Sequence, residues 1–314
     1  MSSQSYDRPF KTAEQLLEHL VSKGLTIQDQ NKAIQFLSSV NYYRFKIYLR
    51  PLRTSNKQYL GNFEDAVSLY RFDEELRNLL LALISRIEIK LRSLLDQMMC
   101  SKTNNPYWYL DDTLFLKDSK IHDMRNSMRR DFNSSKESFS SSFRSNYHNT
   151  FCPSQSTMPP FWIISEVSSF GQIMNLYKSL NKASINEFPY NPLDKLAMKF
   201  GADNLAQLNK WISVIRALRN KSAHHSRVFN ANFQAPSTPR WFSPTYSTAL
   251  ATNSNRLYSG LVMLEIIRKN LQLDFRLKAK LQTLFETHPA SSLHLSAMGV
   301  PQNWDKSSFW NTLL

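Results

Sequence analysis

FEDAVSLYRFDEELRNLLLALISRIEIKLRSLLDQM, residues Phe63 to Met98, is the stretch that decides the fold. Apolar residues recur in it every three or four positions, and it contains neither glycine nor proline. The positions that form one apolar stripe are Val67, Tyr70, Leu76, Leu80, Leu83, Ile87, Leu91, Leu94 and Met98. The pattern predicts one helix of roughly 50 Å, at about 1.5 Å per residue. We expect the other helices to pack against it.

The rest of the chain supports an all-α fold. Only six of 314 residues are glycine, which disfavours glycine-rich phosphate loops and turn-rich β-sandwiches, and neither G-x-G-x-x-G nor G-x-x-x-x-G-K-[ST] occurs. Two short helices are expected around Gly24, and Gly201 with Asp203 marks the end of one helix and the start of the next. Further helical spacing is found in residues 161–180, 192–200, 256–273 and 275–287, and in a helix that begins near residue 204.

The predicted organisation is a helical core with additions at both ends. Residues 1–62 are expected to form an N-terminal helical region, residues 63–287 the core, and residues 288–314 a tail that packs on it. Within the core, residues 117–157 are basic and rich in serine, which indicates a variable helix with a loop or an inserted segment.

The chain is strongly basic. Thirty-nine Lys and Arg against 25 Asp and Glu leave a net charge of +14, a bias that favours a polyanionic partner such as nucleic acid. The segment NYYRFKIYLRP, Asn41 to Pro51, mixes tyrosines with basic residues. Such a mixture can stack bases and neutralise phosphates, but tyrosines also pack well between helices, and packing is the interpretation we favour here.

Several function classes find no support in the sequence. No apolar run is long enough to span a bilayer, and the first ten residues lack the apolar core of a signal peptide. Cys100 and Cys152 make neither a disulfide framework nor a metal cluster, and the seven histidines show no zinc-ligand spacing. Acidic pairs such as Asp73 and Glu74 are more typical of solvated helix ends than of a magnesium site. We therefore expect a cytoplasmic protein without a metal or cofactor.

The segment RNKSAHHSRVFN, Arg219 to Asn230, ends a helix whose apolar stripe includes Trp211 and Leu218. Asn220 and His224 are four residues apart, so they share a face, and this face lies opposite the stripe. Arg219 falls at the edge of the stripe, where a guanidinium removed from water requires a carboxylate partner. Glu88 is the expected partner. It also stands four residues before Arg92, the spacing of a helical ion pair.

Two interpretations of this segment remain open at this point. Basic residues in the last turn of a helix complement its dipole, so the group can be structural. Alternatively, it can cleave RNA, which carries its own nucleophile in the 2′-hydroxyl. Such cleavage needs only proton transfer, which an imidazole provides near neutral pH, and stabilisation of the phosphate by a permanent positive charge. No metal is then required.

The same segment resembles the R-N-x-x-A-H-x-x-R-x-x-N signature of the Abi-like (AbiF/AbiD) abortive-infection proteins, a branch of the HEPN ribonuclease superfamily. Four further regions, which extend the resemblance over nearly the whole chain, are similar to that family: NYYRFKIY from Asn41, LYRFDEELRNLLL with RIEIKLRS across Leu69 to Ser93, PPFWIISEVSSFG from Pro159, and MGVPQNWDKSSFW from Met298. Residues 117–157 match nothing in it.

The resemblance implies a HEPN-like helical bundle that dimerises, so that two copies of the motif form one RNA-cleaving site. Arg219 and His224 would be catalytic and Asn220 would orient them, with Glu88, His225 and Arg227 in support. Cleavage would leave a 2′,3′-cyclic phosphate. Some relatives are phage-defence toxins that a small structured RNA inhibits, and a basic chain suits such a partner.

The expected function is thus a metal-independent endoribonuclease that acts as a toxin or phage-defence effector on RNA. The residues expected to bind RNA are Arg44, Arg125, Arg129, Arg130 and Lys221. One alternative is a non-catalytic protein that grips a structured RNA by its phosphates. Another is nucleotide binding or transfer, for which the sequence offers no partner motif.

Overall fold

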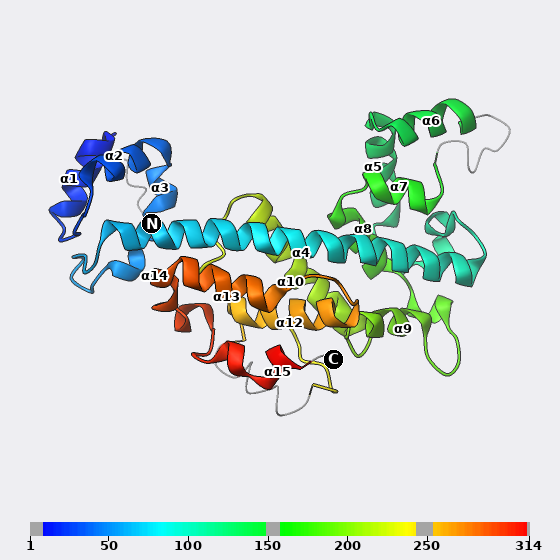
Figure 1. Cartoon of the computed structure of the whole chain (residues 1–314). Coiled ribbons are helices and arrows are strands. Elements are labelled where there is room, and N and C mark those ends of the chain that lie inside the picture. Colours follow the sequence, from blue (N-terminus) through cyan, green and yellow to red (C-terminus); the bar gives the residue numbers. More distant parts are fainter. Residues whose placement is uncertain (1–8, 149–157, 243–253, 313–314) are drawn as a thin grey trace, which may run out of the picture.

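The computed structural model describes residues 9–148, 158–242 and 254–312, and these residues form helices joined by loops. Figure 1 shows one helix, α4, running through the length of the molecule, with α1–α3 at one end and α5–α8 at the other. The α-helices are α1 (Ala13–Val21), α2 (Gln30–Ser39), α3 (Tyr42–Phe45), α4 (Phe63–Thr103), α5 (Ile121–Ser134), α6 (Ser138–Tyr147), α7 (Phe161–Val167), α8 (Phe170–Ser179), α9 (Pro192–Lys199), α10 (Leu205–Ala223), α12 (Leu257–Asn270), α13 (Leu277–Thr287), α14 (Pro289–Ser292) and α15 (Ser308–Asn311).

Short 3₁₀ turns complete the connections. They are η1 (Arg50–Leu52), η2 (Trp108–Leu110), η3 (Asp112–Leu114), η4 (Lys182–Ile185), η6 (Ser296–Met298) and η7 (Trp304–Lys306). Across the described ranges there is no strand, only isolated bridges such as Arg53 with Tyr59. The predicted all-α class is therefore confirmed. No helix in these ranges is both long and apolar enough to cross a membrane.

Helix α4 is the predicted spine, and it is longer than the sequence indicates. It has 41 residues and so extends about 60 Å. The middle of the predicted stripe is buried, but at the ends the buried positions shift: Leu95 and Met99 are buried where Leu94 and Met98 were expected, and Leu69 replaces Tyr70. The shift follows from helix geometry. A straight helix has 3.6 residues per turn, so residues at a regular spacing of three or four positions drift around the helix axis over many turns and leave the buried face.

The helix breaks follow the local sequence. Gly24 (φ 92°) and Gly201 (φ 83°) take left-handed conformations between helices, as expected of glycines that end helices. Residues 161–180, however, form two helices, because Ser169 starts α8 with a capping box in which its side chain accepts from Gln172 N and Gln172 reaches back. Asn204, not Asp203, caps α10.

Seven other helices of the described ranges pack against α4. Helices α10, α12, α13 and α14 contact it, as do α7, α8 and α9 nearer its C-terminal end. The C-terminal segment packs on α12, where Trp310 Nε1 donates to Tyr258 Oη (2.9 Å) and Lys269 Nζ donates to the carbonyl of Phe309 (2.6 Å). Within residues 117–157, α5 and α6 are regular helices. Cys152 lies outside the described residues.

Candidate functional site

Helix α10 positions the Arg219–Asn230 segment. Asn204 caps its first turn by accepting from Gln207 N (3.0 Å), and its apolar face packs on α4. The helix ends in a Schellman motif: Ser226 N donates to Lys221 O (2.8 Å) and His225 N to Ser222 O (3.2 Å). His225 is exposed and occupies the left-handed position (φ 53°) that glycine usually fills. Its backbone therefore ends the helix.

Arg219 pairs with the carboxylate that the sequence indicates. Its Nε lies 3.5 Å from Glu88 Oε1, and the side chains are 38% and 13% exposed, respectively. Burial raises the pKa of Glu88 above its ordinary value, although the charges of Arg219 and Arg92 act in the opposite direction. The pair therefore joins a mostly buried acid to a guanidinium that still reaches solvent. Such a guanidinium retains donors for an incoming anion.

Glu88 faces inward and does not pair with Arg92, although the spacing of the two residues is that of a helical ion pair. Arg92 instead donates through Nη1 to the carbonyls of Ser165 and Ser168, where α7 ends and α8 begins. Burial lowers the pKa of Arg92, and the nearby carboxylates of Glu88 and Glu166 oppose this. Arg92 thus ties the α7–α8 junction to α4 beside Arg219. The PPFWIISEVSSFG region has a structural part in the site, because it supplies the carbonyls that this arginine binds.

A hollow of about 390 Å³ lies between α4 and the end of α10. Its lining consists of Leu81, Ala82, Ser85, Glu88, Arg219 and Ala223. His224, the next residue after this lining, is exposed and caps the helix. Arg219 Nη1 also donates to Asn220 Oδ1 at 3.5 Å, the long limit of a hydrogen bond.

Arg219 and His224 do not share a face of the helix. His224 is five positions after Arg219, which places their side chains about 140° apart around the helix axis. The guanidinium lines the hollow, whereas the imidazole is exposed and is not part of the lining. A single chain therefore presents the two groups on different faces of the end of α10.

Asp73 fixes the chain that leaves the motif, and its expected place at a solvated helix end is wrong. Its carboxylate is fully buried. Oδ1 accepts from the backbone N–H of Val228 (3.0 Å) and Phe229 (2.5 Å), and Oδ2 accepts from Tyr48 Oη (2.5 Å) and from Arg77. The available signal was an acid inside the apolar stripe of α4, since buried charges in proteins require partners.

The residues expected to bind RNA separate into exposed and buried groups. Arg44 on α3 and Arg129 and Arg130 on α5 are exposed, and the half-buried Lys221 stands 5.9 Å above the ring of Phe233. These four are accessible to an outside partner.

Arg125 is different, and the expectation that it binds RNA is wrong. It is only 7% exposed, its Nε donates to the carbonyl of Tyr109 (2.7 Å), and its Nη1 pairs with Asp112. Its guanidinium also lies 5.2 Å above the ring of Phe115. These contacts hold α5 against the loop after α4, and burial leaves no surface for an outside phosphate.

The supporting residue Arg227 lies farther along the same loop. It is half-buried beside Arg50 and Arg256, and burial lowers its pKa. Because Asp73 holds the backbone of the next two residues, Arg227 belongs to the region around the N-terminal end of α4 and not to the Glu88 hollow.

Comparison with known proteins assigns the chain to a protein family. No curated protein and no solved structure matches it significantly. The family model described as Abi-like protein matches residues 35–230, well over half of the chain. The matched region begins in α2, includes all of α4, and ends at Asn230, the last residue of the motif. The chain therefore belongs to the Abi-like protein family.

Proposed function

We propose that this protein is a metal-independent endoribonuclease of the HEPN type, which acts in the cytoplasm as an abortive-infection effector or toxin against phage. The ribose 2′-oxygen attacks the adjacent phosphorus, forming one O–P bond while the bond to the 5′-oxygen breaks. His224 accepts the proton of the 2′-hydroxyl, and the leaving 5′-oxygen takes up a proton. The products are a 2′,3′-cyclic phosphate and a free 5′-hydroxyl, so atoms and charges balance without a metal.

The observation that carries this proposal is the arrangement at the end of α10. Arg219 stands at a hollow beside a mostly buried carboxylate, and His224 is exposed immediately after the lining residue Ala223. A guanidinium stabilises the charge that develops on the phosphate oxygens, and Glu88 fixes its direction. Membership of the Abi-like family is in accord with a role in phage defence.

A second copy of the chain completes the site in this proposal. The surface of α4 beside Glu88 carries Ile89, which is 63% exposed, and the exposed Ala82. A two-fold axis through this surface would bring the two motifs together. The partner subunit's His224 would then supply the proton to the leaving 5′-oxygen. A small structured RNA is the regulator that the basic charge of the chain suits.

Cleavage of RNA in the presence of a chelator tests the catalytic part. Purified protein is incubated with a labelled single-stranded RNA in EDTA, beside His224→Ala and the matched exposed control His122→Ala. We expect the wild type and His122→Ala to produce cyclic-phosphate ends and His224→Ala to produce none. Cleavage by His224→Ala, or cleavage that EDTA abolishes, refutes the proposal.

The oligomeric part is tested separately. Ile89→Asp places a charge on the proposed interface, and Leu116→Asp, at a position 48% exposed on another surface, is its control. We expect Ile89→Asp to sediment as a monomer without nuclease activity and Leu116→Asp to remain an active dimer. An active monomer would show that one chain contains the whole site.

A second candidate function, RNA binding without cleavage, is favoured by one observation. A hollow of about 1270 Å³ lies at the N-terminal end of α4, whereas the hollow at the motif has only about 390 Å³. Binding that weakens steeply with salt, with no product under any condition, would support this candidate.

A further inference from the structure

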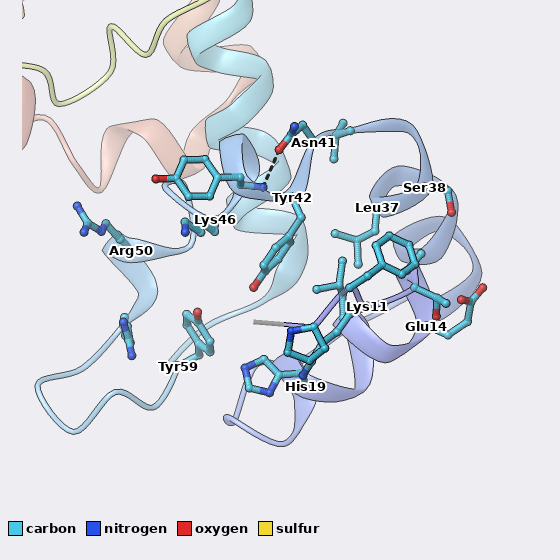
Figure 2. A pocket seen from close by; sticks show the side chains of 18 residues that line it. Lys11, Glu14, His19, Leu37, Ser38, Asn41, Tyr42, Lys46, Arg50 and Tyr59 are labelled. Atoms are coloured by element: carbon cyan, nitrogen blue, oxygen red, sulfur yellow. Dashed lines mark hydrogen bonds between the residues drawn. The ribbon is translucent and has the colours of Figure 1, made fainter. Parts of the chain in front are cut away.

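The hollow at the N-terminal end of α4 has a volume of about 1270 Å³. We call it the N-terminal groove; it is formed by α1, the end of α2, α3 and the loop that leads to α4. Figure 2 shows Tyr42 and Tyr59 pointing into the same space, with Arg50 on one side and Lys11 and His19 on another. Basic and aromatic side chains from four segments thus face one hollow.

The groove is strongly positive. Lys11, Lys46, Arg50 and Arg53 line it, and within the described ranges none of them forms an ion pair with a carboxylate. The acid in the lining, Glu14, is held by a backbone N–H of the first turn of α1 and by Thr12, which lower its pKa. This lowered pKa keeps Glu14 ionised, so it offsets one of the four positive charges in the lining. The lining therefore keeps a net positive charge toward an outside anion.

Aromatic rings stand between these cations. Tyr42 and Tyr59 are half-buried and Tyr43 is 74% exposed, with Lys46 Nζ 3.8 Å from its ring centre. The backbone that carries Tyr43 is fixed, because Asn41 Oδ1 accepts from its N–H (2.9 Å). The aromatic residues of the Asn41–Pro51 segment therefore divide between two roles, exposure at a surface where bases can stack and packing between helices. Its first two tyrosines line the groove, whereas its other aromatic residues, Phe45 and Tyr48, are buried and pack.

A second hollow of about 420 Å³ adjoins the groove, and Arg50 lines both. Its other basic residues are Arg227, Arg256 and His294; we call it the arginine pocket. Arg256 donates to Asn230 Oδ1 (3.0 Å), and the nearby carboxylate of Asp73 is already occupied by four donors. Arg227 follows the motif histidine by three residues. The positive surface therefore continues from the groove to the loop of the motif.

We propose that the N-terminal groove and the arginine pocket together bind a segment of single-stranded RNA, whose strand leads toward His224. Basic side chains contact successive phosphates, and the tyrosine rings stack on bases, as in other proteins that bind single strands. A duplex hides its base faces and does not fit this mode. This inference rests on the proposed function for the identity of the polymer, but it concerns binding and not cleavage.

The test measures equilibrium binding of a fluorescein-labelled single-stranded RNA by anisotropy. All variants carry His224→Ala, so that the probe is not cut. Arg50→Ala/Arg53→Ala is compared with Lys199→Ala/Lys210→Ala, which removes the same charge from exposed positions on α9 and α10. We expect Kd to rise at least about tenfold for the groove variant and less than about threefold for the control. The slope of log K against log salt should fall by about 1.4, for two lost phosphate contacts at about 0.7 each.

A third variant, Tyr59→Leu, tests stacking. It should raise Kd several-fold without changing the salt slope, and its circular dichroism spectrum checks that the fold is retained. Equal losses in the groove and control variants, or equal affinity for a duplex of the same sequence, overturn the inference.

Cleavage in the wild-type background separates the two proposals. If the groove variants bind RNA normally and the wild-type protein cleaves it, only the proposal that the groove binds RNA is refuted. If RNA binding depends on the groove but the wild-type protein cleaves no RNA, only the proposed nuclease activity is refuted.

Discussion

The substitution Asp73→Asn tests how strongly the buried carboxylate holds the structure around the motif. In the wild type, Oδ1 accepts from the N–H groups of Val228 and Phe229, and Oδ2 accepts from Tyr48 and Arg77. An asparagine keeps one acceptor. If its oxygen serves the two backbone N–H groups, its NH₂ faces the guanidinium of Arg77, whose side chain is only 5% exposed.

The energetic cost follows from that stranded charge. Removing one partner of a buried ion pair costs about 3–5 kcal/mol, and the flipped amide instead leaves two buried N–H groups unsatisfied at about 1–3 kcal/mol each. Either orientation predicts a loss of about 4 kcal/mol in the free energy of unfolding. With a urea m-value of about 3 kcal/mol/M, the midpoint should fall by about 1 M.

Urea unfolding followed by circular dichroism measures this loss, with the exposed Asp118→Asn as control, expected within about 0.5 kcal/mol of wild type. The double variant Asp73→Asn/Arg77→Met removes the stranded charge and should recover most of the stability. Amide exchange at Val228 and Phe229 should also accelerate in Asp73→Asn. A loss below about 1 kcal/mol, or no recovery in the double variant, would refute the reasoning.

Four further expectations follow from the site. Arg219→Lys should lose most RNA cleavage, because a point charge does not replace a bidentate guanidinium on phosphate; a wild-type rate in a single-turnover assay would contradict it. His225→Gly should raise the free energy of unfolding by up to about 1 kcal/mol and keep cleavage, since glycine suits the left-handed position; lost cleavage would assign the imidazole a chemical role. Arg129→Glu/Arg130→Glu should weaken RNA binding modestly and leave the rate at saturating RNA unchanged, which a titration of rate against RNA concentration checks. Glu88→Gln should be as stable as wild type at acidic pH, where the glutamate is protonated, and more stable at neutral pH in urea unfolding. Burial raises the folded pKa of Glu88 above its unfolded value, so its ionisation lowers stability as the pH rises through that window; destabilisation at neutral pH would show that attraction to Arg219 outweighs burial.

Much of the fold was predictable because it depends on local periodicity. The long helix, the stop at Gly24, and the start of α10 all depend on residues within one or two turns of each other. The break inside residues 161–180 was missed because Ser168 and Ser169 interrupt no apolar spacing. Their side chains bond to the backbone at the end of α7 and the start of α8, and such bonds leave no trace in a hydrophobic pattern.

The site was predictable only in part, for a related reason. The Arg219–Glu88 pair could be inferred because a guanidinium at the edge of an apolar stripe needs a carboxylate, and Glu88 is an acid on the long helix that forms the spine. Arg125 shows the limit of this reasoning. A cluster of basic residues in a polar segment is typical of a surface, but the side chain of Arg125 turns inward to Asp112 and Phe115. These contacts depend on how α5 packs.

Asp73 connects the two regions for which functions are proposed. Its Oδ2 holds Tyr48, which follows the groove-lining helix α3, and its Oδ1 holds the backbone just beyond the motif histidines, at Val228 and Phe229. One carboxylate therefore fixes the groove relative to the motif, across about 22 Å of α4 between this residue and Glu88. In the proposed complex, a strand of RNA held in the groove would reach His224 in a constant register only while this anchor is intact. The contact joins residues 155 positions apart in the chain, so no spacing within the motif could reveal it.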